Sequence, residues 1–514
     1  MSLNLASLID QSARYFTSEP ALIHDENSLS YGELQGRVRG FAAYLRQAGV
    51  QRGDRVAVLL PNCMSFTVAY FGILYAGAVV VPVSYLSVGR EIAYTLNDSD
   101  AVFLVAWSSY EQQATAGFED AKDCRKLFLV DESSGPLTIL NNEPCHASND
   151  FGCVQTTPED SAVILYTSGT TGQPKGATLS HFNLFSNAQF SCERMFWKPR
   201  EKFEFLGPGH VVLAALPLFH SFGQTCNQNA ALLGGASLSY LERFEPERTL
   251  EVMQRDKITL FTGVPTMYFQ LLNTPGVEKY DLGKLTFSIS GGAAMPVEVL
   301  HEFESRYPVT ILEGYGLSET SPVATFNSLF RERKPGSIGP AIFGVDVRTF
   351  DAEDQETGAD EIGEIVIRGP NVMKGYHGRP EATAEAFQNG WFHTGDMARR
   401  DEEGYFFIVD RKKDMIIRGG FNVYPREVEE VLYSHPAVRE AAVVGAPHDE
   451  YGEEVTAFVS LKPEAGKVEG ASIVTFTKEQ LAAHKYPRIV RVLDDLPKGP
   501  TGKILRKELR KISD

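Results

Sequence analysis

Short runs of hydrophobic residues alternate with segments of helical periodicity over about the first 400 residues of the chain. Two segments that begin at a proline, residues 246–256 and 296–306, have the pattern of helices. The apolar runs are typical of strands buried on both faces of a sheet. The clearest of these runs are residues 55–60, 101–105, 162–166, 211–215 and 285–289. Alternation of this kind predicts an α/β fold with largely parallel sheets.

One uncharged stretch, residues 66–83, imitates a membrane-spanning helix. Gly72, Gly77 and Pro82 interrupt it, and its last residues are mainly valines. We therefore predict a buried helix followed by a buried strand, and no transmembrane segment. The first ten residues lack the basic start and cleavage pattern of a signal peptide, and they predict the beginning of an amphipathic helix.

The pattern changes at residues 410–414, a run of five charged residues with the sequence DRKKD. The segments that follow predict a compact α+β set, with helices at 425–434 and 473–484 and strands at 441–444 and 454–461. We predict two domains, residues 1–409 and residues 410–514. A domain of about 100 residues is large enough to form a core of its own.

Charge and cysteine content narrow the classes of partner. The chain of 514 residues has a formal net charge of −17, which excludes broad binding to nucleic acid because such binding needs a basic surface. None of the six cysteines forms a C-x-x-C pair, so neither a zinc site nor a disulfide framework is expected. Scattered reduced thiols in a large protein favour the cytoplasm.

The strand predicted at 162–166 leads into a loop with the sequence TSGTTGQPKG, residues 167–176. Glycines let successive backbone N–H groups face one anion, hydroxyl groups add donors, and Lys175 adds a positive charge. The loop therefore predicts a phosphate-binding site, with a flexible surface turn as the alternative. Its spacing is not that of a Walker loop, because Pro174 precedes Lys175. The candidate binding residues are Thr167, Ser168, Gly169, Thr170, Thr171 and Gly172.

Further motifs follow this loop along the chain. They are LPLFHSFG at 216–223, SGGAAMP at 290–296, YGLSET at 315–320, GWFHTGD at 390–396, RGGFN at 418–422 and PKGPTGKIL at 497–505. Together with the loop, they resemble the adenylate-forming superfamily of acyl-CoA synthetases, amino-acid adenylation domains and beetle luciferases. The resemblance extends from about residue 29 to residue 509 and is greatest to fatty acyl-CoA ligases. It implies a large domain of layered α/β sheets, including a small β-barrel-like part, and a small mobile α+β C-terminal domain.

The resemblance implies an ATP site. Tyr315 would stack on adenine, and Asp396 would accept hydrogen bonds from the ribose hydroxyls, with Arg411 as a second ribose contact. The less favoured reading of Asp396 is a turn residue after Gly395, and residues 290–296 could also be a strand-to-helix turn. The other nucleotide-binding residues implied by the resemblance are Gly291, Gly292, Glu313, Gly314, Gly316, Ser318 and Lys413.

The same resemblance implies the catalytic groups. Glu319 and Thr167 would hold Mg²⁺, a hard cation that prefers oxygen ligands. Lys175 would neutralise phosphate charge, and Lys503 would reach the substrate carboxylate and the bridging oxygen as the adenylate forms. His220 would lie beside that carboxylate, although a lone histidine is more often structural.

We expect two half-reactions. The carboxylate attacks the α-phosphate of ATP, giving acyl-AMP and pyrophosphate, and a thiol then attacks the acyl-adenylate. Between the two steps the small domain would turn about Lys413, withdrawing Lys503. Turning would also bring residues 418–422 to the site, where they would line a channel for the pantetheine arm of CoA.

The expected acceptor is CoA, because the chain shows no carrier domain and no room for the insertion typical of ligases that serve carrier proteins. A medium- or long-chain fatty acid is the first choice of acid. The alternatives are an aryl acid of the cinnamate or benzoate type, transfer to a carrier protein, and an inactive scaffold. The last is disfavoured because Lys175, Glu319, Asp396 and Lys503 are all present. We expect a monomer or homodimer, with peripheral membrane contact left open.

Overall fold

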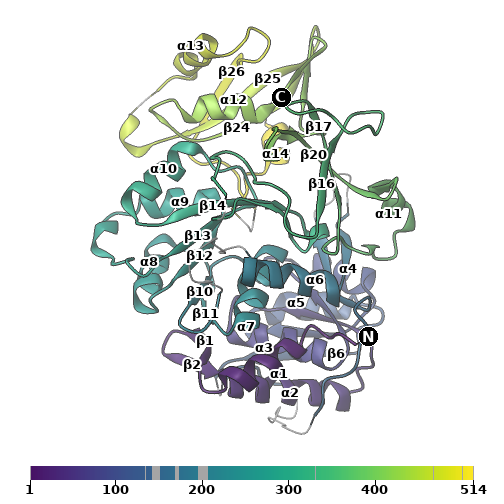
Figure 1. The fold of residues 1–514 in the computed structure, drawn as a ribbon. Helices are drawn as coiled ribbons and strands as arrows, with labels where there is room; N and C mark the ends of the chain where they lie inside the picture. The colour runs from purple at the N-terminus through teal and green to yellow at the C-terminus, as the bar shows by residue number, and fades with distance from the viewer. Residues whose placement is uncertain are drawn as a thin grey trace.

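The computed structural model describes residues 2–133, 135–141, 151–167, 173–194, 206–329, 331–466, 468–499 and 502–512. Two eight-stranded sheets form the larger part of the molecule (Figure 1). In the first sheet, the central strands are parallel and only the two edge strands run antiparallel to their neighbours. Its order is β15 (Val323–Phe326), β14 (Thr310–Gly316), β13 (Phe287–Ser290), β12 (Leu260–Gly263), β10 (Val211–Ala214), β11 (Ser237–Tyr240), β1 (Pro20–His24) and β2 (Asn27–Ser30).

The second sheet has a parallel centre with antiparallel strands at both edges. Its order is β18 (Gly375–Tyr376), β9 (Lys175–Ser180), β8 (Ser161–Thr167), β4 (Val79–Pro82), β3 (Arg55–Leu59), β5 (Ala101–Trp107), β6 (Lys126–Asp131) and β7 (Thr138–Ile139). The expectation of largely parallel sheets is confirmed. The α-helices that precede or connect the strands of these sheets are α1 (Ser7–Phe16), α2 (Tyr31–Gln47), α3 (Met64–Tyr75), α4 (Gly89–Asp98), α5 (Glu111–Glu119), α6 (His181–Gln189), α7 (Ala230–Gly234), α8 (Pro246–Arg255), α9 (Pro265–Leu272) and α10 (Val297–Arg306).

Helix α3 explains the uncharged stretch of the sequence. All twelve of its residues are buried, and it contacts β3 and β4 of the second sheet and β1 of the first. A helix that is apolar on every face has to be covered on every face, so it lies inside the main hydrophobic core. The prediction of a buried helix followed by a buried strand is confirmed by α3 and β4. In the part of the chain that the structure describes, no helix has the length and apolar character needed to cross a membrane.

Residues 346–411 form a smaller antiparallel sheet beside the first two. Its strands are β16 (Asp346–Phe350), β17 (Ile362–Arg368), β20 (Trp391–Arg400) and β19 (Phe387–Gln388), with β21 (Phe406–Arg411) paired to β20. The short helix α11 (Pro380–Ala386) precedes β19.

The chain after residue 415 forms its own mostly antiparallel sheet, which Figure 1 shows above the rest of the molecule. The strands are β23 (Phe421–Val423), β22 (Ile416–Arg418), β25 (Gly452–Leu461) and β24 (Val438–His448), with β26 (Ile489–Leu493) parallel to β25. The helices are α12 (Pro425–Tyr433), α13 (Gly470–Gln480) and α14 (Arg506–Lys511). Two hydrophobic clusters consist only of residues from this part of the chain. The expected small α+β unit is therefore present.

Several element boundaries differ from the predicted ones; the strand expected at 441–444, for example, is β24 and extends from Val438 to His448. The first helix begins at Ser7, after a turn. The strand expected at 285–289 begins at Phe287, because Leu285 is still in a turn closed by its N–H bond to the Leu282 carbonyl. Helix α13 ends at Gln480 because Leu481 adopts an extended backbone.

Candidate active site

The predicted site residues gather at the carboxyl ends of the parallel strands of the first sheet. His220 follows β10, Gly291 follows β13, and Tyr315 lies at the end of β14. Thr266 follows β12, and its hydroxyl donates to the Gly502 carbonyl at 3.4 Å, so the Lys503 loop of the last domain lies over the same edge. Ligands of α/β proteins bind at this edge of the sheet.

Glu319 is the centre of one group of contacts. It lies in a 3₁₀ turn after β14 and is 8% exposed. Its Oε1 atom accepts hydrogen bonds from the Tyr376 hydroxyl at 3.0 Å and the Thr167 hydroxyl at 3.5 Å. The Lys175 ammonium lies 5.2 Å from the centre of the Tyr376 ring. Thr167 and Lys175 are paired across β8 and β9, at the two ends of the predicted phosphate loop. Ser168, Gly169, Thr170, Thr171 and Gly172 lie outside the described residues.

Burial raises the pKa of the Glu319 carboxyl, and hydrogen bonds and the charge of Arg411 only partly oppose this rise. A carboxylate held at low exposure with few cations nearby is prepared to bind a cation, since a bound cation would relieve the cost of its burial. Among the described residues, no group of three or more histidine, cysteine or acidic side chains could hold a metal by itself.

Asp396 is the centre of a second group of contacts. This carboxylate, 5% exposed, accepts from the Tyr315 hydroxyl at 2.6 Å through Oδ2 and pairs with the Arg411 guanidinium at 3.1 Å through Oδ1. Asp396 and Arg411 are direct partners on β20 and β21. Burial is the largest influence on the pKa of Arg411 and lowers it, but Asp396, Tyr315, Asp414 and Glu319 together outweigh burial and leave this pKa raised. The three residues expected to hold adenine and ribose are therefore in one place.

Two glycines allow the backbone of this site to approach its neighbours closely. A Cβ atom on Gly316 would lie 1.9 Å from the Pro322 carbonyl oxygen, so no other residue fits after Tyr315. A Cβ atom on Gly291 would lie 2.9 Å from the Phe222 ring, and Gly292 has a φ of +77°. Gly316 and Gly291 therefore allow the backbone to pack directly against Pro322 and Phe222, and Gly292 allows a positive φ that other residues rarely adopt.

The remaining predicted residues have structural contacts of their own. Burial raises the pKa of Glu313 to about 7, and its carboxylate accepts from the Gly336 backbone N–H at 3.1 Å. Ser318 and Ser221 have their hydroxyl oxygens 3.5 Å apart, and a Cβ on Gly314 would meet the Phe326 ring at 2.7 Å. None of these contacts by itself points to a nucleotide.

The positive charge of Lys503 acts on the imidazole of His220, although the two residues are far apart in the sequence. Burial and then the charge of Lys503 lower the pKa of His220 to about 4. Burial and then the charge of Arg411 lower the pKa of Lys503 to about 8. Lys503 is exposed to solvent, although protein groups lie close enough to its amine to disfavour the charge. His220 is neutral at pH 7, so it can position a carboxylate only by hydrogen bonding, and Lys503 supplies the positive charge.

Two contributors to the site were not predicted from the sequence. Tyr376 links Lys175 to Glu319, but a tyrosine in the sequence MKGYHG carries no motif that would single it out. Thr266, whose hydroxyl donates to the Gly502 carbonyl, belongs to none of the motifs named above. The available signal was a polar side chain in the otherwise apolar sequence GVPTM, residues 263–267.

Comparison with known proteins agrees with this geometry. Residues 9–377 match the AMP-binding enzyme family, and residues 427–503 match the C-terminal domain of AMP-binding enzymes. A long-chain-fatty-acid–CoA ligase of Bacillus subtilis is 37% identical over 532 residues, which cover 98% of this chain and 94% of the relative. A feruloyl-CoA synthase of an Amycolatopsis species is 36% identical, covering 97% of each chain.

A solved structure has the same arrangement over the full length. The crystal structure of ATP-bound MatB from Rhodopseudomonas palustris superposes with a TM-score of 0.88 at 32% identity, covering 100% of this chain and 99% of the other. Family, relatives and fold support ATP and CoA as substrates. The chain belongs to the AMP-binding enzyme family and is an AMP-forming acid–thiol ligase, which makes acyl-CoA through acyl-AMP.

Proposed function

We propose that the acid is a medium- or long-chain fatty acid. The 37% identity to a long-chain-fatty-acid–CoA ligase over 98% of the chain supports this choice. Apolar side chains also support it, because Phe222 lies beside Gly291 and Val264 lies beside Gly292. An aryl acid is the alternative, supported by the 36% identity to a feruloyl-CoA synthase.

The observation that carries the proposed mechanism is the convergence of Lys503, His220, Asp396 and Glu319 on one edge of the first sheet. In the first half-reaction the acid carboxylate forms a bond to the α-phosphorus, and the bond to pyrophosphate breaks. Lys503 stabilises the charge that develops on the α-phosphate and the leaving group, Lys175 neutralises the other phosphates, and His220 positions the acid. Asp396 and Arg411 fix the ribose. The catalysis is positioning and electrostatics, without a side-chain nucleophile.

Mg²⁺ fits the Glu319 group, because this ion is commonly held by one or two carboxylates together with substrate phosphates. Glu319 and Thr167 would hold it, since their side-chain oxygens are 3.5 Å apart and the carboxylate is buried. When bound, the ion neutralises phosphate charge. Tyr376 keeps Glu319 oriented by its hydrogen bond of 3.0 Å.

For the second half-reaction we propose a domain boundary at residue 410 and a pivot at Lys413. The thiol of CoA forms a bond to the acyl carbon, and the bond to AMP breaks. Turning about Lys413 would remove Lys503 and bring residues 418–422 to the adenylate. Gly419 and Gly420 support this role, because both have positive φ, 56° and 84°, and carry no side chain that could obstruct a channel.

A panel of acids tests the proposed substrate. Burying one CH₂ group contributes about 0.8 kcal/mol, so kcat/KM should rise about fourfold with each added methylene until the pocket is full. Pyrophosphate release measured with ATP, CoA and saturated acids of increasing length should show this rise. If cinnamate or benzoate is turned over better than every fatty acid, the aryl alternative is correct. If activity appears only with an added carrier protein, the acceptor is not CoA.

The low pKa of Lys503 predicts a pH dependence of the first half-reaction. The protonated amine is the active form, and its pKa is lowered from 10.5 to about 8, so activity should fall as the pH rises through about 8. Because kcat/KM reports the free enzyme, the fall in kcat/KM for ATP should approach about tenfold per pH unit above that value. Pyrophosphate release at pH 6–10 measures it. A Lys503→Arg variant keeps its charge throughout this range, and a profile as steep as that of the unaltered enzyme would assign the titration to another group.

We also propose the cytoplasm as the compartment and a monomer or homodimer as the assembly. Cys63, Cys124, Cys153, Cys192 and Cys226 are free thiols, which suits a reducing compartment.

A further inference from the structure

The loop that carries Lys503 is fixed at both of its ends. Leu496 before the loop and Leu509 after it are buried in the same small cluster with Phe458. Within the loop, the Gly499 N–H donates to the Lys503 carbonyl at 2.8 Å. Movement of helix α14, which begins three residues after Lys503, would therefore move Lys503 as well.

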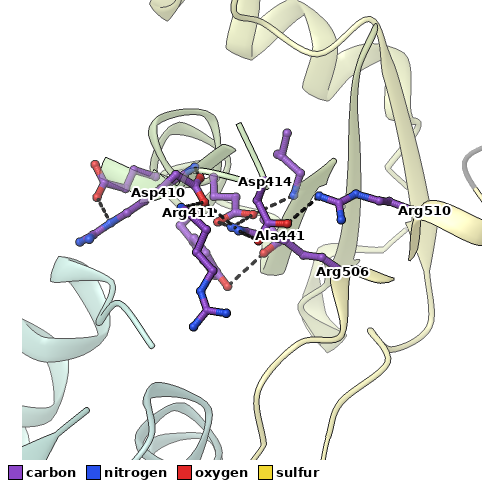
Figure 2. Close-up of polar contacts among 11 residues, drawn as sticks. Asp410, Arg411, Asp414, Ala441, Arg506 and Arg510 are labelled. Carbon is purple, nitrogen blue, oxygen red and sulfur yellow. Dashed lines mark hydrogen bonds and ion pairs between the residues drawn. The ribbon is translucent and has the colours of Figure 1, made fainter. Parts of the chain in front are cut away.

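Arg506, the first residue of α14, has three acidic partners. Its guanidinium donates to both carboxylate oxygens of Glu429 at 2.8 Å and to Oδ1 of Asp410 at 3.0 Å, and it lies 3.6 Å from Asp414. Arg510, one turn later, pairs with Asp414 at 2.6 Å. Figure 2 shows Arg506 and Arg510 reaching from the C-terminal segment toward Asp410 and Asp414, while the Arg411 guanidinium points away from this cluster. Both ends of the short helix are thus tied to the DRKKD run.

The partners of Arg506 lie on opposite sides of the proposed pivot at Lys413. Asp410 is on β21 and pairs with Met397 of β20, so it is part of the sheet of residues 346–411. Glu429 on α12 and Asp414 follow the pivot and belong to the last sheet and its helices. The Asp410–Arg506 pair therefore crosses the pivot and joins helix α14 to the sheet of residues 346–411, whereas both members of the Glu429–Arg506 pair follow the pivot.

We propose that Arg506 is a positioning residue, which through its ion pair with Asp410 holds the Lys503 loop in the orientation needed for the first half-reaction. The proposal rests on the proposed function, because it assumes the pivot and the role of Lys503. When the chain after Lys413 turns, Glu429 and Asp414 travel with Arg506, whereas Asp410 stays with the sheet of residues 346–411. The guanidinium thus keeps acidic partners in both orientations, and of its three acidic contacts only the one with Asp410 has to break.

The pair is well placed to bias the two orientations. Asp410 is 4% exposed, and its second oxygen accepts the Arg426 N–H at 2.9 Å. The Arg426 guanidinium in turn donates to the Ile408 carbonyl at 2.8 Å, which is a second contact across the pivot. A buried carboxylate with fixed hydrogen bonds presents its charge in one direction, so its pairing with Arg506 depends strongly on orientation.

Asp410→Asn is the main test variant, because it removes the crossing charge but leaves the Glu429–Arg506 pair and one acceptor oxygen in place. Acyl-AMP formation should become about tenfold slower, the size of losing one charge-assisted hydrogen bond. The loss should be in kcat, with KM for ATP changed less than about twofold, because the pair acts through Lys503 in the transition state. Thioester formation from supplied acyl-AMP should be as fast as in the unaltered enzyme, or faster.

Arg506→Lys keeps the charge but loses the two-pronged geometry, and should give a smaller effect in the same direction. In the double variant Asp410→Asn with Arg506→Lys, the two losses should not add, because both act on one pair. Glu427→Gln is the matched control. It breaks the ion pair of Glu427 with Lys485, at 2.7 Å, on the same helix as Glu429 but within one domain, and should leave both half-reactions unchanged.

The proposal is overturned if Asp410→Asn slows both half-reactions equally, slows neither, or slows them no more selectively than Glu427→Gln. Lys503→Ala, measured in parallel, separates this failure from failure of the proposed function. If Lys503→Ala separates the half-reactions and Asp410→Asn does not, only the role of Arg506 is wrong. If Lys503→Ala does not separate them, the scheme of two orientations is wrong.

Discussion

Replacing Lys503 by alanine should slow acyl-AMP formation by about 10²–10³-fold, the cost of removing one group that stabilises developing charge. The structure gives the reason. Lys503 lies near His220, which is neutral at pH 7 with a pKa of about 4, so the lysine ammonium is the positive charge at that side of the site. The rate of pyrophosphate release in the absence of CoA measures this step.

The same variant should form thioester from supplied acyl-AMP and CoA at close to the normal rate. In that step pyrophosphate has already left, so no charge develops on it. The proposed turn about Lys413 also takes residue 503 away from the adenylate. Lys498→Ala is a suitable control, because Lys498 is on the same loop but pairs with Glu440 at 2.9 Å within the last domain. Equal loss of both half-reactions in Lys503→Ala would contradict the use of two faces of the small domain.

The layered α/β fold could be predicted because its signals are local. The uniformly apolar stretch that contains α3 and β4 can be stable only when other parts of the protein cover it on all sides. The valine-rich runs form parallel strands, as such runs commonly do. The small C-terminal unit could be predicted because the charged residues 410–414 separate two segments, and each segment has enough apolar residues to form a core.

The buried polar segment after His220 could not be predicted in the same way. The π-helix Phe222–Asn229 contains a run of amide and hydroxyl side chains that is buried throughout. Its amides bind partners on α3, with Thr67 donating to Gln228 at 2.6 Å and Tyr70 to Gln224 at 3.4 Å. Burial of such residues depends on partners from a distant segment, which the local pattern does not reveal.

The candidate site was predictable one motif at a time but not as an arrangement. The motifs predicted Glu319, Asp396 and Lys503 separately, whereas Tyr376 and Arg506 act through contacts with residues far away in the sequence. The approach of Lys503 to His220 depends on how the last domain lies against the first, and no local signal specifies that orientation.

Replacing Glu319 by glutamine should slow acyl-AMP formation on the order of a hundredfold and raise the Mg²⁺ concentration needed for half-maximal rate. Glutamine has nearly the same shape and can still accept the hydrogen bond that Tyr376 donates at 3.0 Å. The change therefore removes charge with little effect on packing. Initial rates of pyrophosphate release over a range of Mg²⁺ concentrations at saturating ATP measure both effects.

Two control variants make the assignment specific. Tyr376→Phe removes only the hydrogen bond that orients Glu319, and should cost about tenfold or less. Asp10→Asn removes a part-buried carboxylate that pairs with Arg39 at 2.7 Å outside the site, and should leave the Mg²⁺ dependence unchanged.

Because burial raises the pKa of Glu319, a bound cation should also keep its carboxyl ionised at lower pH. The rate of the unaltered enzyme should therefore fall at a lower pH when Mg²⁺ is saturating than when it is limiting, and this difference should disappear in Glu319→Gln. If Glu319→Gln keeps the normal Mg²⁺ dependence, the metal is held by other groups.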